Sequence, residues 1–148
     1  QCLYTHLSSL NECATIGYPL GKVLPEKGEV NRGIFTVQND YVQSNTELFG
    51  ISKLNLKEKR LHENSLCSMN IFGLTKKVLP LLISRLNTFE GIHKNNRTVE
   101  FLLNVELSHL INEKKISMKL YPTTAQWMGI TNPSDEERVR NMLLEKII

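Results

Sequence analysis

Apolar residues along the chain recur at two different spacings, which predict strands alternating with helices. Compact or alternating apolar runs predict strands over residues 13–18, 33–37, 41–43, 67–74 and 116–121, with a short strand or edge segment over residues 126–130. The second and third of these runs flank Asn39-Asp40, which favours a hairpin. The polar, lysine-rich residues 44–64 predict an irregular excursion, the least ordered part of the chain.

Helix-like spacing recurs between and after these runs. Residues 1–9 have their apolar positions on one face and predict the end of a helix. Thr75 is positioned to cap a second helix that runs through Leu86, and Thr98 is positioned to open a third that ends near Lys115. Residues 132–136 combine a capping residue, a first-turn proline and acidic side chains, which predicts a final helix.

This alternation predicts an α/β fold with a mixed, mostly parallel sheet flanked by helices. The β-hairpin is expected as an insertion after the first strand. A chain of 148 residues, of which 41% are hydrophobic, has the size of one ordinary domain. We find no internal repeat in the sequence, so residues 1–148 are assigned to a single domain.

Charge and cysteine content limit the expected partners. The chain has 18 basic and 15 acidic residues that are interspersed, so we expect no nucleic-acid partner. No apolar run approaches the roughly 18–20 residues that span a bilayer, so we expect no membrane partner. Cys2, Cys13 and Cys67 form no C-x-x-C pair, which argues against a disulfide framework or a zinc site and favours the reducing cytoplasm.

Sequence motifs for nucleotide or metal binding are not found. The eight glycines form neither G-x-x-x-x-G-K nor G-x-G-x-x-G, which are the loops that hold phosphates in α/β proteins. The four histidines are too scattered to suggest a set of metal ligands. No catalytic residue and no metal ligand is therefore assigned.

Polar residues inside apolar or turn segments are better candidates, because burying a polar side chain is unfavourable unless a partner or ligand satisfies it. The three that stand out are Arg32, Glu47 and Asn70. Asn and Glu side chains suit sugar hydroxyls, and the planar Arg guanidinium suits a phosphate. A structural interpretation stays open beside this one, in which the arginine and the asparagine make all their hydrogen bonds within the protein.

Several sequence blocks resemble a known family when taken in order. They are GYPLGKVLPEKGEVNRG (residues 17–33), SMNIFG (residues 68–73), VEFLL (residues 99–103) and PTTAQWMGITNPSD (residues 122–135). Together they resemble the sugar-phosphate nucleotidyltransferases over roughly residues 13–143. Within that family the chain is most similar to the subgroup whose tryptophan segment is Trp-x-Gly-Val-Thr.

The resemblance implies an activity and a set of substrate-binding residues. Members of the family join a sugar 1-phosphate to a nucleoside triphosphate and release pyrophosphate, using Mg²⁺, on a mostly parallel sheet. Carried over by position, the loop from Gly28 through Arg32 would approach the sugar and Glu47 would hold sugar hydroxyls. Ser68 and Asn70 would line the sugar pocket.

The resemblance covers only part of the family pattern. Residues 1–10 do not match the family's nucleotide loop or its first metal-binding aspartate, and Gly129 stands where many members have the second. The expectation is therefore a partial, C-terminal domain that binds a sugar 1-phosphate, takes a nucleoside triphosphate only when an N-terminal half is supplied, and has no assignable Mg²⁺ ligand. The alternative is a non-catalytic relative that serves as a binding or regulatory module. A sheet cut between its halves would have an unpaired edge, which predicts a homo-oligomer or poor solubility, and the alternative predicts that a partner covers this edge.

Overall fold

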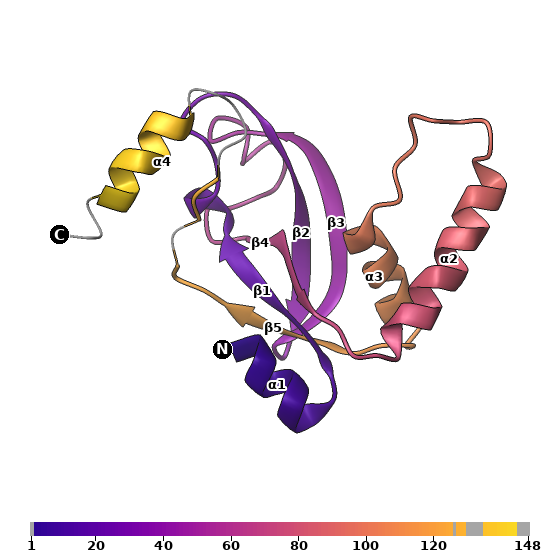
Figure 1. The fold of residues 1–148 in the computed structure, drawn as a ribbon. Helices are drawn as coiled ribbons and strands as arrows, with labels where there is room; N and C mark the ends of the chain where they lie inside the picture. Colours follow the sequence, from indigo (N-terminus) through magenta and orange to yellow (C-terminus); the bar gives the residue numbers. More distant parts are fainter. Residues whose placement is uncertain (1, 126, 130–134, 145–148) are drawn as a thin grey trace.

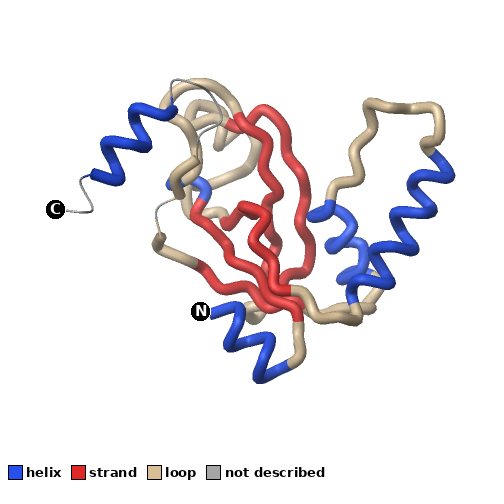
Figure 2. The backbone as a smooth tube through the Cα atoms, in the orientation of Figure 1, coloured by secondary structure: helices blue, strands red, loops and turns tan. Residues whose placement is uncertain are grey.

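Figure 1 shows the order of the strands and helices in the computed structural model, which describes residues 2–125, 127–129 and 135–144. The elements are α1 (Cys2–Leu10), β1 (Cys13–Pro19), the 3₁₀ turn η1 (Leu20–Lys22), β2 (Val30–Gln38), β3 (Tyr41–Ile51), β4 (Leu66–Gly73), α2 (Val78–Ile92), α3 (Leu103–Asn112), β5 (Met118–Pro122) and α4 (Asp135–Leu144). In Figure 2, α2 and α3 lie on one side of the strands, whereas α4 lies on the opposite side.

The described strands close into a small barrel in the order β1-β4-β2-β3-β5. Strand β1 pairs with β4 in antiparallel and with β5 in parallel orientation, and β2 and β3 form an antiparallel hairpin. Two narrow junctions complete the ring. They are the antiparallel pairs Ile34 with Cys67, between β2 and β4, and Tyr41 with Lys119, between β3 and β5.

The predicted mostly parallel sheet is therefore wrong, because four of the five strand pairings in the described residues are antiparallel. The hairpin explains the difference, since strands joined by a tight turn must run antiparallel. It is also not a side insertion, because β2 and β3 are the strands that connect β4 to β5. Closure pairs the strands on both sides, so the unpaired edge expected from the sequence is not found among the described strands.

The hairpin is longer than its sequence pattern predicts. Asn39 and Asp40 at its tip have φ values of 51° and 67°, which is the left-handed pair of a tight hairpin turn. Residues 44–51 continue β3 rather than starting an irregular excursion, and only residues 52–65 form the loop to β4. Residues 127–129 form no strand, and residues 126 and 130 lie outside the described part of the chain.

The third predicted helix starts later than expected. Thr98 does not cap α3, because its hydroxyl and its backbone N–H both bond Oδ1 of Asn96 within the preceding loop. Leu102 is extended, and the helix begins at Leu103. Similarly, α2 begins at Val78 without a side-chain cap from Thr75. The predicted start of the last helix at residues 132–134 lies outside the described residues, and α4 itself spans Asp135–Leu144.

Two apolar clusters fill the interior. One lies between the barrel and the helices and contains Val78 of α2, Leu107 and Leu110 of α3, and Met118 and Leu120 of β5. The other lies around η1 and the loop after β3 and consists of Leu20, Val23, Leu24, Ile51, Leu56, Leu61 and Cys67. Between α2 and α3, Arg85 forms ion pairs with Glu106, at 2.9 Å, and with Glu113. These ion pairs join α2 to α3, and α3 in turn contacts the barrel where Oγ of Ser108 accepts from the backbone N–H of Asn45 in β3.

The cysteines provide a test of this packing. Cys67 is fully buried and Cys13 is 3% exposed, whereas Cys2 is exposed. Under native conditions near pH 8 we expect an aromatic disulfide reagent to modify Cys2 rapidly and the other two thiols only after unfolding. Counting released thiolate by absorbance measures this, and rapid modification of all three thiols would contradict the packing.

Burial raises the pKa of Cys67 to about 11, although Arg32 nearby acts in the opposite direction. A raised pKa means that the folded state favours the neutral thiol. The stability linked to this thiol is therefore present below its ordinary pKa of 9.0 and is lost as the pH rises towards 11. Unfolding curves of Cys67→Ala should lack this alkaline loss, which the Cys2→Ala variant should retain.

Candidate functional site

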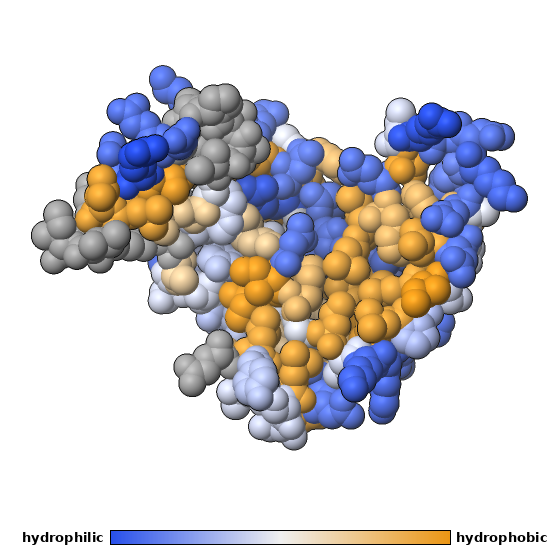
Figure 3. All heavy atoms as spheres, viewed as in Figure 1, coloured by the Kyte–Doolittle hydropathy of each residue, from blue (hydrophilic) through white to orange (hydrophobic). Residues whose placement is uncertain are grey.

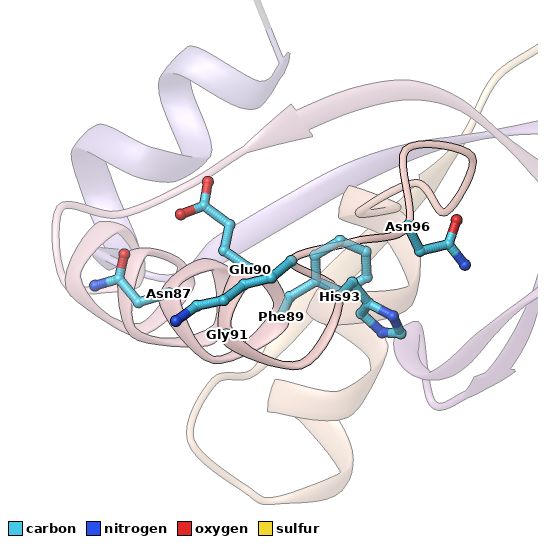
Figure 4. Close-up of a pocket in the computed structure, with 7 residues that line it drawn as sticks. Asn87, Phe89, Glu90, Gly91, His93 and Asn96 are labelled. Atoms are coloured by element: carbon cyan, nitrogen blue, oxygen red, sulfur yellow. The ribbon is translucent and has the colours of Figure 1, made fainter.

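A wide hollow lies at the end of α2 and in the loop that follows it (Figure 4). Its volume is about 640 Å³, and the side chains of Asn87, Glu90 and Asn96, which line it, point in different directions. Phe89 packs against His93 and Phe101, with ring centroids 4.5 and 5.4 Å apart. Because binding sites need polar groups that converge on a ligand, this hollow is explained by helix packing.

A smaller cleft of about 170 Å³ is more polar and gathers several of the predicted residues. It is lined by Asn31, Arg32, Gly33, Glu47, Ser68, Met69, Asn70, Leu102 and Asn104. These residues come from β2, β3, β4 and the start of α3, so the barrel and one helix together form the walls. Sites for drug-sized ligands are roughly 300–1,000 Å³, and this cleft therefore suits a single small polar ring.

A bulge in β4 sets the position of Ser68 and Asn70. The register between β1 and β4 shifts, because Thr15 pairs with Phe72 while Gly17 pairs with Ser68. Asn70 lies in this bulge with φ of 56°, a conformation that Asn tolerates better than most residues, and its backbone N–H donates to Oγ of Ser68 at 3.1 Å. Bulges of this kind often redirect side chains beside binding sites.

The opposite wall of the cleft contains Glu47 and Asn104. Glu47 lies on β3, opposite Gly33 of β2, and accepts a hydrogen bond on Oε2 from Nδ2 of Asn104. Asn104 is in the first turn of α3 and is only 7% exposed. The hydrogen bond holds the carboxylate in one position beside the cleft.

Gly33 makes the close approach of these polar side chains possible. A Cβ atom at this position would lie 2.8 Å from Nδ2 of Asn104 and 2.3 Å from Oδ1 of Asn45. Asn45 is 5% exposed, and its amide atoms have no hydrogen-bond partner within the described residues. Only glycine leaves room for both amides beside β2.

Arg32 provides the positive charge of the cleft. Its Nη1 donates to the backbone oxygen of Asn31 at 2.8 Å, and its guanidinium lies 5.8 Å from the ring centroid of Trp127. Its Nε is buried and has no hydrogen-bond partner within the described residues. The Nη end of the guanidinium is exposed and makes one hydrogen bond within the described residues, so it is suited to binding an anionic group.

Four of the five predicted substrate-binding residues therefore line one cleft: Arg32, Glu47, Ser68 and Asn70. Gly28 does not, because it lies in the exposed loop before β2, where its φ of 91° serves a turn. Asn104 and Leu102 also line the cleft, although the sequence analysis does not assign them to a site. The signal for Asn104 was an Asn inside the apolar run of residues 101–107, the same signal that selected Asn70 in β4.

Other site chemistry is limited in the described part of the chain. The described side chains form no group of three or more His, Cys, Asp or Glu residues suited to a metal ion. None of the described helices is long and apolar enough to cross a membrane. No protein-family model matches the chain, and no curated protein matches it.

Proposed function

We propose that this chain binds a sugar 1-phosphate and is the sugar-binding part of a nucleotidyltransferase. The observation that carries the proposal is the convergence of Arg32, Glu47, Ser68 and Asn70 from three strands on one small polar cleft. Arg32, Glu47 and the neighbouring Ser68 and Asn70 lie on three different strands, and the resemblance implies sugar contacts for each of them. Three unpaired cysteines fit the reducing cytoplasm as its compartment.

Each side chain has a role that its chemistry allows. Glu47 accepts hydrogen bonds from sugar hydroxyls, and Asn70 can both donate and accept. The positive charge of Arg32 lies beside the phosphate of the sugar. This charge lowers the repulsion between the sugar 1-phosphate and the nucleoside triphosphate, which are both anionic. In the family reaction a sugar-phosphate oxygen attacks the α-phosphorus of a nucleoside triphosphate and pyrophosphate leaves. Magnesium assists that step in the family, but the described residues offer it no ligand cluster and we assign it none.

Thermal unfolding with ligand panels tests the proposal. A ligand that binds only the folded state stabilises it by about 2.7 kcal/mol at a concentration of 100 Kd. We expect at least one hexose 1-phosphate to raise the unfolding midpoint in a saturable manner, and nucleoside triphosphates with Mg²⁺ to leave it unchanged. Glu47→Gln should reduce the shift at least several-fold, because the charged acceptor is lost.

The exposed Glu58→Gln variant is the matched control, since it makes the same chemical change in the loop after β3. It should respond to sugar phosphates as the unmodified chain does. A midpoint that no sugar phosphate changes would reject the proposal. Equal shifts in the two variants would show that the ligand binds outside the cleft.

The second candidate function is a non-catalytic interaction module. It is favoured by the exposed apolar side chains Leu79, Ile83 and Leu86, which lie along one face of α2. Figure 3 shows apolar side chains gathered over α2 and the neighbouring strands. If no ligand changes the unfolding midpoint and light scattering shows that the chain self-associates, this second function is preferred.

A further inference from the structure

We infer that Asn104 is a positioning residue for Glu47 and that the two side chains together select ligands with two neighbouring hydroxyl groups. The selection rests on the proposed function, whereas the contact between the two residues stands on its own. Asn104 is 7% exposed and donates from Nδ2 to Oε2 of Glu47, which is the carboxylate side chain in the cleft. The amide therefore holds one carboxylate oxygen and leaves the other available.

The hydrogen bond determines what the cleft can recognise. With Nδ2 of Asn104 bonded to Oε2 of Glu47, the acceptors that the pair keeps for a ligand are Oδ1 of Asn104 and Oε1 of Glu47, and both residues line the cleft. A pair of acceptors suits a vicinal diol, which can donate one hydroxyl proton to each. A deoxy sugar that lacks one of these hydroxyls would leave an acceptor without a donor, and such a loss strongly reduces binding.

The surrounding structure holds Asn104 and Glu47 in place before a ligand binds. Asn104 lies in the first turn of α3. This helix packs on the barrel through Leu107, and Oγ of Ser108 accepts from the backbone N–H of Asn45 in β3 at 3.0 Å. Gly33 leaves the space into which Nδ2 projects. A carboxylate that is already held loses little side-chain freedom on binding, which increases affinity.

The test compares Asn104→Leu with Asn112→Leu, an exposed position at the end of the same helix. The probes are α-D-glucose 1-phosphate, α-D-galactose 1-phosphate and the 2-, 3- and 4-deoxy analogues of each, measured by calorimetric titration. We expect Asn104→Leu to weaken a parent sugar phosphate about tenfold, as for one lost hydrogen bond to a charged group. It should weaken the deoxy analogue that lacks the hydroxyl held by Asn104 by a smaller factor, because only the positioning of Glu47 is lost for that ligand, while Asn112→Leu changes neither affinity.

A double-mutant cycle tests the contact without ligand. The unfolding midpoints of Asn104→Leu, Glu47→Leu and the double variant should be non-additive, because leucine at either position removes the same hydrogen bond. If the two single changes in the midpoint add up to the change in the double variant, the hydrogen bond between Asn104 and Glu47 is wrong. Equal weakening of every sugar phosphate by Asn104→Leu would overturn the selection role while the proposed function stands. If the unmodified chain binds none of the sugar phosphates, the proposed function and the selection role are both rejected, and the cycle alone decides the contact.

Discussion

Gly33→Ala is expected to destabilise the chain by about 1–3 kcal/mol, the usual cost of forcing an extra carbon into packed surroundings. The added Cβ would lie 2.3 Å from Oδ1 of Asn45 and 2.8 Å from Nδ2 of Asn104. Both distances are shorter than real Cβ contacts, so at least one amide must move. Sugar-phosphate binding should weaken as well, since moving Asn104 releases Glu47. Urea unfolding gives the first effect, and the thermal shift with sugar 1-phosphate gives the second.

Gly91→Ala is the matched control. Gly91 is in α2, and a Cβ atom there would meet nothing within 4 Å. Because alanine favours helix over glycine, this variant should be stabilised by roughly 0.5–1 kcal/mol and should bind ligand normally. If Gly33→Ala unfolds at the same urea concentration as the unmodified chain, the close packing of the two amides against β2 is wrong.

Leu107→Ala is expected to have the largest effect on stability, a loss of about 2–5 kcal/mol. Leu107 is 2% exposed and belongs to the cluster that joins α3 to the barrel. Its removal leaves a cavity one turn from Asn104, on the helix that positions this residue. We therefore expect sugar-phosphate binding to weaken together with stability. Urea unfolding and calorimetric titration measure the two effects.

Leu79→Ala makes the same substitution on α2, where the side chain is 56% exposed. Its cost should stay within about 0.5 kcal/mol, as for most surface changes. Equal losses in the two leucine variants would mean that α3 does not pack as described here. If Leu107→Ala loses much stability but binds sugar phosphate with unchanged affinity, the position of Asn104 does not depend on the packing of α3.

The positions of the strands could be predicted from local sequence, but their pairing could not. The runs that became β1, β4 and β5 were recognised because buried strands need compact apolar sequence. Their orientation depends on contacts between distant residues, such as Cys13 with Met118, which no local pattern encodes. Alternation with helices suggested parallel pairing, whereas the long hairpin closed the sheet into a barrel.

The predicted start of α3 is wrong because other local contacts engage Thr98. Thr98 is a good capping residue by type, but the side chain of Asn96 accepts both of its hydrogen bonds two residues earlier. Phe101 then packs against Phe89 of α2 before the helix begins. Sequence alone cannot rank these alternatives, because the ring contact depends on where α2 lies.

The candidate site was partly predictable for a related reason. Arg32, Glu47 and Asn70 were selected as polar residues in apolar or turn segments, and all three line the cleft. Applied to the apolar run of residues 101–107, the same argument also selects Asn104. The role of Gly33 could not be foreseen, since it depends on the approach of α3 and β3 to one point of β2.

The central claim is that the cleft beside Glu47 binds a sugar phosphate, and a titration followed by two-dimensional ¹H–¹⁵N NMR tests it most directly. With α-D-glucose 1-phosphate and related hexose 1-phosphates, we predict saturable shifts of the backbone signals of Gly33, Asn70 and Asn104. The side-chain amide of Asn104 should shift with them, because it bonds the carboxylate that accepts the sugar hydroxyl. Signals at the end of α2, around His93, should stay in place. Shifts confined to that region, or no shifts with any sugar phosphate, would contradict the claim.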